Sequence, residues 1–440
     1  MKGSTDFDVV VVGGGIVGLA SAYKITLNHP DVRIALLEKE EELAAHQTGH
    51  NSGVIHSGLY YQPGSVKAIT CANGRKELVA FAEQYEIPYE ICGKIIVATN
   101  ENELVDMELI FQRGLENEIE GIEKIGPEEI LEIEPNCDGL AGIYVPCTGI
   151  IDFREVANKL AELIAANGPE NQVLTSHEVI GFDKHDFYTM VMTTERNFSA
   201  KYIINCAGLQ SDRVARMDNI DPVVRIVPFR GDYYELTEAA SDKVRNLIYP
   251  VPDPDLPFLG VHFTRMIDGG VECGPNAVFS FKREGYGKFD FNFKDAWESL
   301  SYAGTWKLFM RYMGYGLGEY TRAFSKKLFL RGLQRLVPSL QAEDIIPCKA
   351  GVRAQAIGPT GETIDDFRIE RKSNSIHVLN APSPAATASL AIGDYICRIA
   401  AEFFNLPKPQ KEVKKKTTKR RKRKTKKKTE KSADDQEPQE

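Results

Sequence analysis

The chain has 440 residues, of which 42% are hydrophobic and 26% are charged, a composition typical of a globular protein with room for two or three domains and a buried cofactor. Its eight cysteines lie far apart and form no CxxC pair, which argues against a zinc site, an iron–sulfur cluster and a secreted disulfide scaffold, so we expect no metal and a reducing compartment. The net charge of −8 is unevenly divided, because residues 408–440 contain 15 Lys and Arg against 6 Asp and Glu, so that an acidic body carries a basic tail.

The first apolar run, Val9–Tyr23, could be mistaken for a signal peptide or a membrane anchor. It is too short to span a bilayer, three consecutive glycines interrupt it, and Asp6 and Asp8 precede it. No other uncharged stretch approaches the length of a membrane span. We therefore predict a cytoplasmic protein and leave open a peripheral contact with the inner face of the cell membrane.

The first 40 residues alternate between strand and helix patterns. Asp8–Val12 and Val32–Leu37 are short apolar runs typical of fully buried strands, and Gly15–Leu27 between them has the periodicity of a helix. Buried strands connected by a helix predict a parallel sheet that is covered on both faces.

The rest of the chain contains further helix and strand patterns. Helices are predicted at 66–90, 101–120, 154–167, 293–340 and 385–404, strands at 94–99, 173–180, 187–194, 202–205 and 375–379, and a turn-rich segment at 137–149. Between Val223 and Phe281 apolar and polar residues alternate, as in Val261-His262-Phe263-Thr264, which is typical of an antiparallel sheet with one solvated face.

The segment Gly13-Gly14-Gly15-Ile16-Val17-Gly18 has the GxGxxG spacing of a dinucleotide-binding loop. It follows a predicted strand and opens a predicted helix, and Glu38 ends the next strand, 20 residues after Gly18. Gly13 permits the tight turn, Gly15 lets the backbone approach the pyrophosphate, and Gly18 allows close helix–strand packing. The helix N-terminus would face the phosphates, and the Glu38 carboxylate would accept hydrogen bonds from ribose hydroxyls. The alternative is a glycine-rich turn of an ordinary α/β protein.

Two features favour FAD over NAD as the dinucleotide. Tyr202–Gly208 is a second strand followed by a small-residue turn, resembling the element that returns to the nucleotide in flavoproteins of this fold. The chain has one glycine-rich dinucleotide loop, whereas a flavin reductase that uses NADPH would have another near mid-chain. Electrons are therefore expected to enter from the substrate.

Residues 50–61, His-Asn-Ser-Gly-Val-Ile-His-Ser-Gly-Leu-Tyr-Tyr, together with the N-terminal loop, resemble the D-amino-acid-oxidase superfamily and, within it, the L-2-hydroxyglutarate oxidase/dehydrogenase group. Lys349–Gln355 and Asn380–Ser389 carry the same resemblance, which covers residues 6–405 and leaves the tail outside. It implies that L-2-hydroxyglutarate is oxidised to 2-oxoglutarate by hydride transfer from the substrate Cα to flavin N5, with the electrons passed to oxygen or a quinone. The alternative is another oxidoreductase of the superfamily, acting on an amino acid, an amine or glycerol-3-phosphate.

The element pattern and the resemblance together predict an α/β fold. A discontinuous Rossmann-like FAD-binding domain would hold an inserted α+β substrate domain built on an antiparallel sheet, and a disordered basic tail would follow. The FAD-binding domain would comprise residues 1–90, 151–220 and 346–406, the substrate domain residues 91–150 and 221–345, and the tail residues 407–440.

The resemblance also implies which residues contact FAD. They lie in the glycine loop, after the second strand, in the 50–61 segment, around the second turn and in the proline-rich turn before the last helix: Gly13, Gly15, Ile16, Val17, Gly18, Glu38, Lys39, Asn51, Ser52, Gly53, Val179, Cys206, Ala207, Gly208, Ala386 and Thr387. Some relatives attach flavin through a cysteine, which the proline-rich turn lacks, so FAD is expected to bind non-covalently.

The implied reaction needs a base that takes the hydroxyl proton as the hydride leaves, and histidine is the usual side chain for this task. His56 is the first candidate, because its segment should run past the isoalloxazine in this fold. His262, on a predicted substrate-domain strand, is the second, and His50 keeps a smaller claim. The alternative for His56 is a loop histidine bonded to nearby backbone.

The implied substrate carries two carboxylates, so two cationic or donor-rich contacts are expected. Arg353 matches the arginine that relatives with carboxylate substrates use as a bidentate clamp. Arg265 would hold the distal carboxylate, and Tyr249 or Tyr234 would supply a hydroxyl, although aromatic residues on such strands more often pack the core.

Residues 414–428 are almost entirely Lys, Arg and Thr. Contact with an anionic membrane leaflet, worth roughly 1 kcal/mol per basic residue, would suit a dehydrogenase that delivers electrons to a membrane quinone. Charge also allows non-specific nucleic-acid adhesion, but no aromatic residue is present to stack on bases, so specific recognition is not expected. Besides the two enzyme activities, a third hypothesis is a protein that tethers nucleic acid or membrane and whose flavin-binding fold is vestigial. The sequence identifies neither the electron acceptor nor the oligomeric state.

Overall fold

The computed structural model describes residues 5–253 and 259–408, and its first sheet is parallel at the centre. Five strands pair in parallel in the order β9-β2-β1-β12-β22, and β10, β11 and β21 pair antiparallel with one another or with this core. The parallel strands are β1 (Phe7–Val12), β2 (Ile34–Leu37), β9 (Gln172–Leu174), β12 (Phe198–Asn205) and β22 (Ser375–Asn380), and the others are β10 (Val179–Lys184), β11 (Thr189–Thr193) and β21 (Arg368–Lys372).

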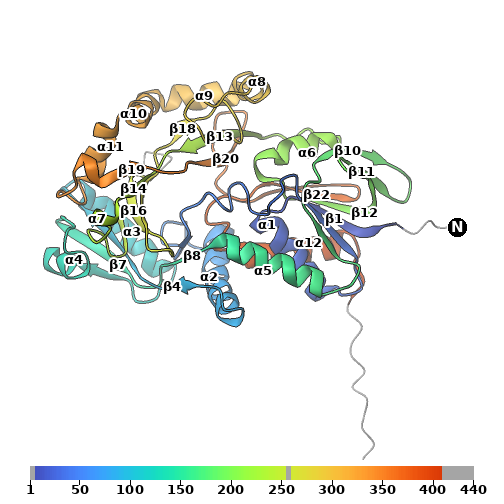
Figure 1. Ribbon diagram of the computed structural model, residues 1–440, viewed down its shortest axis with the longest axis horizontal. Coiled ribbons are helices and arrows are strands. Elements are labelled where there is room, and N and C mark those ends of the chain that lie inside the picture. The colour runs from blue at the N-terminus through green and yellow to red at the C-terminus, as the bar shows by residue number, and fades with distance from the viewer. Residues whose placement is uncertain (1–4, 254–258, 409–440) are drawn as a thin grey trace, which may run out of the picture. The chain divides into compact units, whose positions relative to one another are not determined.

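Both faces of this sheet are covered, which confirms the prediction from its continuous apolar strands. Val9 and Val11 of β1 belong to one hydrophobic core, and Val10 belongs to another on the opposite face. The first core includes residues of α1 (Ile16–Asn28), α2 (Val66–Gln84), α5 (Phe153–Ala166) and α12 (Ser389–Phe403), and the second includes Val214 of α6 (Ser211–Met217) (Figure 1).

The second sheet has eight strands in the order β19-β14-β17-β16-β15-β5-β7-β6, all antiparallel except the pair β15–β5. Its strands are β5 (Lys94–Ala98), β6 (Glu123–Ile125), β7 (Ala141–Val145), β14 (Tyr234–Leu236), β15 (Leu247–Pro250), β16 (His262–Arg265), β17 (Val271–Gly274) and β19 (Ile345–Pro347). The helices of this region are α3 (Glu103–Glu116), α4 (Pro127–Ile133), α7 (Glu238–Ser241) and α11 (Lys326–Leu333), with a short 3-10 turn at Ala342–Asp344.

The expectation of one solvated face is wrong at the centre of this sheet. Every residue of β5 is buried, because Ile95 and Val97 join a core with α4 and α11 while Ile96 and Ala98 join another with α3. The outer strand β14 keeps the predicted alternation of buried and partly exposed residues.

The predicted turn-rich segment 137–149 contains strand β7 and the start of β8 (Gly149–Ile151). The glycines that favoured a turn are strand residues where another backbone comes close. A Cβ on Gly142 would lie 3.0 Å from the carbonyl oxygen of Ile96, and one on Gly149 would lie 2.4 Å from that of Glu90. Glycine is needed here because another backbone lies too close for a side chain, but in the sequence the same glycines indicate a turn.

Two small sheets complete the structure. In one, β8 pairs with β3 (Val54–Ile55) and β4 (Tyr89–Glu90). In the other, β13 (Arg225–Gly231) pairs along its whole length with β20 (Gly351–Ile357) and also with β18 (Val278–Phe279). The predicted helical region 293–340 begins with three short helices, which follow one another along one edge in Figure 1: α8 (Phe293–Leu300), α9 (Ala303–Arg311) and α10 (Met313–Phe324).

The α/β fold with a Rossmann-like sheet is confirmed, while the exact domain boundaries stay a prediction. The first sheet draws its strands from three separate stretches, 7–37, 172–205 and 368–380, and the second from 94–145 and 234–347. The prediction for the tail falls almost wholly on residues 409–440, outside the described residues. Among the helices of the described part, none combines the length and the apolar character that a membrane crossing requires. All eight cysteines are free.

A buried ion pair connects α6 to the segment that follows β18. The Arg283 guanidinium donates to both carboxylate oxygens of Asp212, at 2.5 and 3.1 Å, and to the carbonyl of Leu209 at 2.6 Å. Both side chains are almost completely buried. Burial favours the neutral acid, but the Arg283 charge outweighs it, with help from Arg216, and the net effect lowers the pKa of Asp212 below 3.8.

Asp212→Asn should destabilise the protein by about 3–5 kcal/mol, because it removes the fully buried carboxylate that pairs with Arg283 and leaves that charge only the longer contact with Glu298 at 3.3 Å. A lowered folded-state pKa means that the stabilisation is complete above the pKa of the unfolded chain and is lost as pH falls through the folded value. The difference in thermal stability between wild type and variant should therefore hold from neutral pH to about 4 and shrink below it.

The matched control is Asp221→Asn. Asp221 pairs with Arg225 at 3.2 Å but is 84% exposed, so this change should alter stability by about 0.5 kcal/mol or less. Equal effects of the two substitutions would contradict the role assigned to the buried pair.

Candidate active site

A large cavity lies at the carboxyl ends of the parallel strands. Its volume is about 1100 Å³, and it is lined by the residues that follow β1, β2, β12 and β22 together with residues of β15, β16 and β20. This is the edge at which doubly wound sheets bind nucleotides, and the volume exceeds that of an ordinary small-molecule site. The cavity therefore has room for a dinucleotide and a small substrate.

The glycine loop is shaped by close backbone approach. Gly13 has φ +112°, and a Cβ there would lie 2.5 Å from the carbonyl oxygen of Cys206. A Cβ on Gly18 would lie 2.1 Å from the carbonyl oxygen of Gly13. Gly15 faces the cavity, and the nearest neighbour of a Cβ there would be the Thr48 hydroxyl at 3.4 Å. Gly13 and Gly18 are thus needed for packing, and Gly15 leaves space for a ligand.

Two side chains hold this loop at the start of α1. Glu38, which is buried, accepts from the backbone N–H of Gly14 at 2.7 Å and, through its other oxygen, from that of Glu40 at 2.9 Å. The Thr48 hydroxyl accepts from the N–H of Ile16 at 3.0 Å. Glu38 therefore shapes the loop from beside the cavity, a role beyond the ribose contact expected from sequence.

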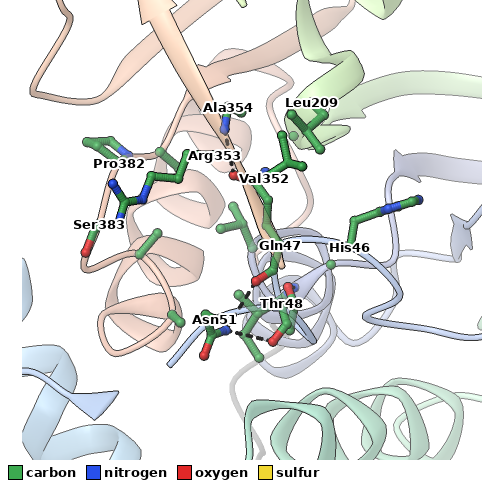
Figure 2. A pocket seen from close by; sticks show the side chains of 18 of the residues that line it. His46, Gln47, Thr48, Asn51, Leu209, Val352, Arg353, Ala354, Pro382 and Ser383 are labelled. Carbon is green, nitrogen blue, oxygen red and sulfur yellow. Dashed lines mark hydrogen bonds between the residues drawn. The ribbon is translucent and has the colours of Figure 1, made fainter. Parts of the chain in front are cut away.

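The 46–51 segment connects the loop to β20. Figure 2 shows Gln47 reaching Ala354, whose N–H donates to the Gln47 side-chain oxygen at 3.1 Å. The Asn51 amide donates to the carbonyls of Gln47 and Thr48, at 3.3 and 2.7 Å, and accepts from Gly53 N–H at 2.8 Å. Gln47 and Thr48 were missed in the sequence, because hydrogen bonds to residues distant in sequence leave no periodic signal.

The cavity brings together most of the residues predicted to contact FAD. Those that line it are Gly13, Gly15, Ile16, Val17, Glu38, Lys39, Asn51, Ser52, Val179, Cys206, Ala207, Gly208, Ala386 and Thr387. Gly18 and Gly53 do not line it: Gly18 packs on Gly13, and a Cβ on Gly53 would lie 2.9 Å from the carbonyl oxygen of Ile151. Burial raises the pKa of the Cys206 thiol to about 12, so this cysteine at the cavity wall is protonated.

The glycine loop and the start of α1 have the features that a bound FAD requires. Gly15 exposes its backbone without a side chain, and the N-terminus of the 13-residue helix α1 points into the cavity beside it. The positive end of a helix macrodipole and an unobstructed backbone suit a pyrophosphate. The chain therefore offers a nucleotide end of the cavity that fits FAD.

His56 follows β3, and its backbone is fixed on both sides. Its N–H donates to the Thr387 hydroxyl at 3.1 Å, and its carbonyl accepts from the Cys71 thiol at 3.5 Å. Thr387 in turn donates to the carbonyl of Val54 at 3.1 Å. Among the described residues the ring of His56 has no hydrogen-bond partner, and it lines the cavity. The backbone of His56 is thus fixed, while its ring is left available to a ligand in the cavity.

His262 also lines the cavity, with a fixed tautomer. Its Nδ1 lies 2.8 Å from the carbonyl oxygen of Gly260, and because a carbonyl can only accept, Nδ1 carries the proton and Nε2 is left as an acceptor. Its ring lies 4.1 Å from that of Tyr249, which lines the cavity as well. His50 is bonded through Nδ1 to the Ala350 carbonyl at 2.8 Å and stacks on Tyr286, so it is a structural residue in this arrangement.

Lys94, at the start of β5, is a buried cation that sequence reasoning missed. Its ammonium lies 4.7 Å from the ring centre of Tyr249 and 4.8 Å from that of Tyr60, and among the described residues it has no carboxylate partner. Burial lowers its pKa to about 8, although Cys147 and Cys71 oppose the change. The signal available in the sequence was a lysine opening an otherwise apolar strand.

Burial and nearby positive charges keep both cavity histidines neutral. Burial, with the charges of Lys94, His262 and Lys67, lowers the pKa of His56 from 6.5 to about 3. Burial, with Arg353 and Lys94, lowers the pKa of His262 to about 4 in spite of its bond to Gly260. A neutral imidazole can accept a proton, and an anion bound beside it would raise the pKa and strengthen it as a base.

Arg353 lines the cavity from β20, and Figure 2 shows its guanidinium extending toward Pro382 and Ser383 of the turn before α12. Lys67, in the first turn of α2, is a second cavity cation that was missed in the sequence. Its ammonium lies 4.7 Å from the ring centre of Tyr61, and burial lowers its pKa although Asp365 and Asp366 oppose the change.

The structure does not support the expected contact of Arg265 with the distal carboxylate. Arg265 does not line the cavity but pairs with Glu90. Residues three apart on a strand point to opposite faces, so when His262 faces the cavity Arg265 faces away. Tyr234 also packs elsewhere, against Phe329 in the core.

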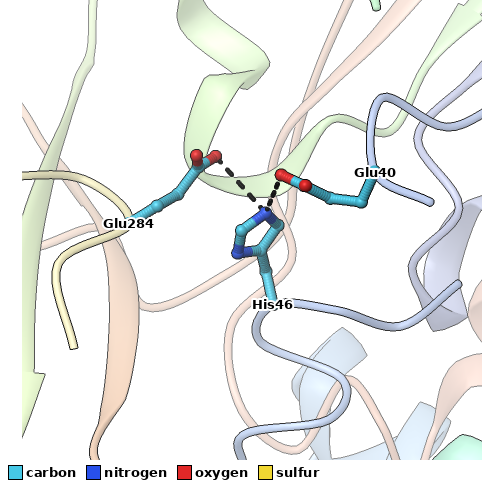
Figure 3. A group of neighbouring side chains, drawn as sticks. All are labelled: Glu40, His46 and Glu284. Atoms are coloured by element: carbon cyan, nitrogen blue, oxygen red, sulfur yellow. Dashed lines mark hydrogen bonds and ion pairs between the residues drawn. The ribbon is translucent and has the colours of Figure 1, made fainter. Parts of the chain in front are cut away.

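Figure 3 shows the group Glu40, His46 and Glu284, whose ligand-type atoms lie within 4.8 Å of one another. His46 Nε2 lies 2.9 Å from Glu40 and 3.7 Å from Glu284. The Lys39 ammonium bonds to both carboxylates, at 3.0 Å for Glu284. A lysine that already neutralises these acids makes the group an ion-pair cluster joining the residues after β2 to those after β18, and no metal is required to explain it.

The sequence matches known proteins over nearly all of the described chain. The model of the FAD dependent oxidoreductase family matches residues 8–399. An L-2-hydroxyglutarate dehydrogenase of Indibacter alkaliphilus is 50% identical over 400 residues, which are 91% of this chain and 100% of that protein. The L-2-hydroxyglutarate dehydrogenase of Escherichia coli strain K12 is 45% identical over 391 residues, covering 89% of this chain and 92% of that one. The human mitochondrial L-2-hydroxyglutarate dehydrogenase is 42% identical over 420 residues, covering 92% and 90%.

Solved structures of other proteins have a similar overall fold. Reduced L-α-glycerophosphate oxidase from Mycoplasma pneumoniae, with FAD bound, has a TM-score of 0.73 and 25% sequence identity, covering 92% of this chain and 96% of that one. Glycine oxidase from Geobacillus kaustophilus has a TM-score of 0.67 at 16% identity, covering 91% and 95%, and this likeness concerns the fold alone.

Gly18→Ala should cause the purified protein to lose most of its flavin, measured as the ratio of visible flavin absorbance to protein absorbance. The new methyl group would meet the Gly13 carbonyl at 2.1 Å, and overpacking of this kind costs about 1–3 kcal/mol and shifts the loop. The matched control is Gly314→Ala in α10, where nothing lies within 4 Å of the added carbon. A Gly18→Ala protein with full flavin content would contradict this account of the loop.

Proposed function

Because the chain belongs to the family of FAD-dependent oxidoreductases and, within it, to the L-2-hydroxyglutarate dehydrogenases, we propose that it oxidises L-2-hydroxyglutarate to 2-oxoglutarate. The cofactor is FAD. The observation that carries the proposal is a single cavity with a nucleotide end at the glycine loop and a cationic end formed by Lys67 and Arg353, with Lys94 buried behind two of its lining rings. A substrate with two carboxylates matches that charge.

FAD, when bound, supplies the acceptor for the hydride that leaves the substrate Cα. The residues of this chain would do the rest. The glycine loop, Glu38 and the Cys206–Gly208 turn would hold the nucleotide, and the Ala386–Thr387 turn lies next to His56 through the Thr387 hydroxyl. The same hydroxyl thus couples the position of the cofactor turn to the position of the proposed base.

His56 is the proposed base. A neutral ring nitrogen of His56 would accept the substrate hydroxyl proton, leaving an imidazolium, while the Cα–H bond breaks. Burial is the largest cause of the His56 pKa of about 3, and the charges of Lys94 and Lys67 add to it, so a carboxylate bound near these lysines would cancel the part that is due to charge. The base is therefore strengthened by the substrate that it serves. His262, with Nε2 as an acceptor, would receive a hydrogen bond from the substrate.

Arg353 and Lys67 are the proposed carboxylate contacts. Arg353 can bind one carboxylate through two parallel N–H groups, and Lys67 offers a point charge to the other. Tyr249 would orient the substrate beside His262, whose ring it contacts. Lys94 lies behind Tyr249 and Tyr60, so we assign it a positioning and electrostatic role.

The electron acceptor, by this proposal, is oxygen or a membrane quinone. A cytoplasmic location fits eight cysteines that are all free. A peripheral contact of the basic tail with an anionic membrane would bring the enzyme to a lipid-dissolved acceptor.

The function is tested by adding substrates to the oxidised holoenzyme without oxygen and following the loss of visible flavin absorbance. L-2-Hydroxyglutarate should bleach the flavin, while D-2-hydroxyglutarate, glycerol-3-phosphate and glycine should not. Bleaching by glycerol-3-phosphate or glycine alone would replace the proposal with another activity of the superfamily. Mixing the reduced enzyme with oxygen or a soluble quinone then identifies the acceptor.

His56→Asn should lower the rate of flavin reduction by about 10²- to 10⁴-fold, because a positioned base is removed, with the flavin content unchanged. For wild type, a pKa of His56 near 3 means that the base stays unprotonated in the free enzyme far below neutral pH. Accordingly kcat/KM should not fall through this group between about pH 7.5 and about pH 5. A fall centred on the ordinary histidine pKa that His56→Asn abolishes would contradict the assigned environment.

Arg353→Met and Lys67→Met should each raise KM for L-2-hydroxyglutarate by about 10- to 100-fold, because each removes a charged hydrogen bond to a carboxylate. Arg265→Met is the matched control, since Arg265 lies on the same strand as His262 but pairs with Glu90. Its KM should stay within about twofold of wild type. A large effect of Arg265→Met with none of Lys67→Met would restore the assignment expected from the sequence.

A further inference from the structure

Apolar side chains are exposed along α8, α9, α10 and the loop before them, an area that we call the aromatic surface. Its members are Phe289, Phe291, Phe293, Trp297, Trp306, Met310, Met313 and Phe324. They are between 52% and 87% exposed. Single exposed apolar residues are ordinary, but a gathering of this size on consecutive elements marks an interaction site.

Two ring contacts join members of this surface, one between two elements and one within α8. Phe289 in the loop lies 6.0 Å from Phe324 at the end of α10, and Phe293 lies 6.4 Å from Trp297. Figure 1 shows α8, α9 and α10 in sequence along the edge beyond β13 and β18. In α10, added carbons on Gly314 and Gly316 would meet nothing within 4 Å, so this helix has a bare side. The apolar side chains therefore lie on consecutive elements of one region, and the Phe289–Phe324 contact joins the two ends of that region.

The charges around the aromatic surface are basic. Exposed cations of the same stretch are Lys288, Lys294, Lys307, Arg311, Lys326, Lys327 and Arg331. Within residues 281–331 the exposed acid is Asp290, while Glu284, Asp295, Glu298 and Glu319 are at least partly buried and pair with Lys39, Arg213, Arg283 or Arg322. This contrasts with the body of the chain, since residues 1–407 contain 39 Lys and Arg against 56 Asp and Glu.

We propose that the aromatic surface docks on an anionic lipid bilayer. Exposed Phe, Trp and Met beside Lys and Arg are the combination that lies at the boundary between lipid headgroups and acyl chains, where the rings enter and the cations stay with the phosphates. The local positive charge on an acidic body is complementary to an anionic leaflet. The contact is peripheral, since the helices involved have 8, 9 and 12 residues.

This surface is distinct from the basic tail and does not require the proposed reaction. Its attraction is mainly apolar, whereas a tail of Lys and Arg binds through charge alone. The two contributions are therefore separable by salt and by deletion.

The chain contains two tryptophans, Trp297 and Trp306, and both belong to the aromatic surface. Their fluorescence thus reports on this surface without a label. The holoenzyme is mixed with vesicles of phosphatidylcholine with phosphatidylglycerol, and with phosphatidylcholine alone, and binding is measured in parallel by sedimentation. A blue shift of tryptophan emission with the anionic vesicles, retained in a chain ending at residue 408, is the expected result.

The test variant combines Phe289→Ser, Phe293→Ser and Met310→Ser, which leaves both tryptophans in place. In the chain ending at residue 408 it should weaken vesicle binding at least about tenfold, because each change removes apolar area that would leave water. Phe187→Ser is the matched control, since Phe187 is 79% exposed on the turn between β10 and β11. Activity with a soluble acceptor should be unchanged in all variants.

Three results would overturn the proposal. The triple variant could bind vesicles as tightly as wild type, or deletion of the tail could abolish all binding and the emission shift. In the third case, sedimentation velocity without lipid would show that wild type self-associates and the triple variant does not, and the surface would then be an interface between copies of this chain.

Discussion

The backbone of Gly13 lies so close to that of Cys206, and Gly18 so close to the carbonyl of Gly13, that neither glycine can carry a side chain, and the site depends on these two approaches. The first arises because β1 pairs in parallel with both β2 and β12, which brings the ends of all three strands to one edge. Parallel pairing also aligns α1 behind the loop with its N-terminus toward the cavity. From this edge the chain builds a nucleotide site with backbone, and leaves side chains of other segments to supply the chemistry.

Those side chains form an unusually cationic interior. Burial keeps the two cavity histidines neutral, with added positive charge from Lys94 and Lys67 at His56 and from Arg353 and Lys94 at His262. Lys94 is buried between aromatic rings, and burying a charge costs stability, so such an arrangement is explained best by an anionic ligand that completes it. By the proposed mechanism, an anion bound there would offset the charge contribution to the low pKa of His56, although not the larger contribution of burial.

The segment after β18 connects this interior to the surface. Arg283 anchors it through the buried pair with Asp212, and Glu284 through Lys39. A few residues later the same segment exposes Phe289, Phe291 and Phe293. One loop thus joins the nucleotide-binding half of the chain, through two ion pairs, to the start of the aromatic surface.

The sequence by itself determined the parallel sheet and the glycine loop, and nearly all of the residues that it predicts to contact FAD line one cavity, because these features depend on local patterns: apolar strands, fixed glycine spacing and segments resembling a known family. It also identified His56, His262, Tyr249 and Arg353, which the structure places around one cavity. Only the tertiary structure decided that Arg265 faces away from the cavity, that Lys67 lines it and that Lys94 lies behind Tyr60 and Tyr249, since strand register and cross-sheet packing join residues far apart in sequence. The strand at 141–145 was missed for the same reason. Its glycine is required by the close approach of another strand, which is not visible in the sequence.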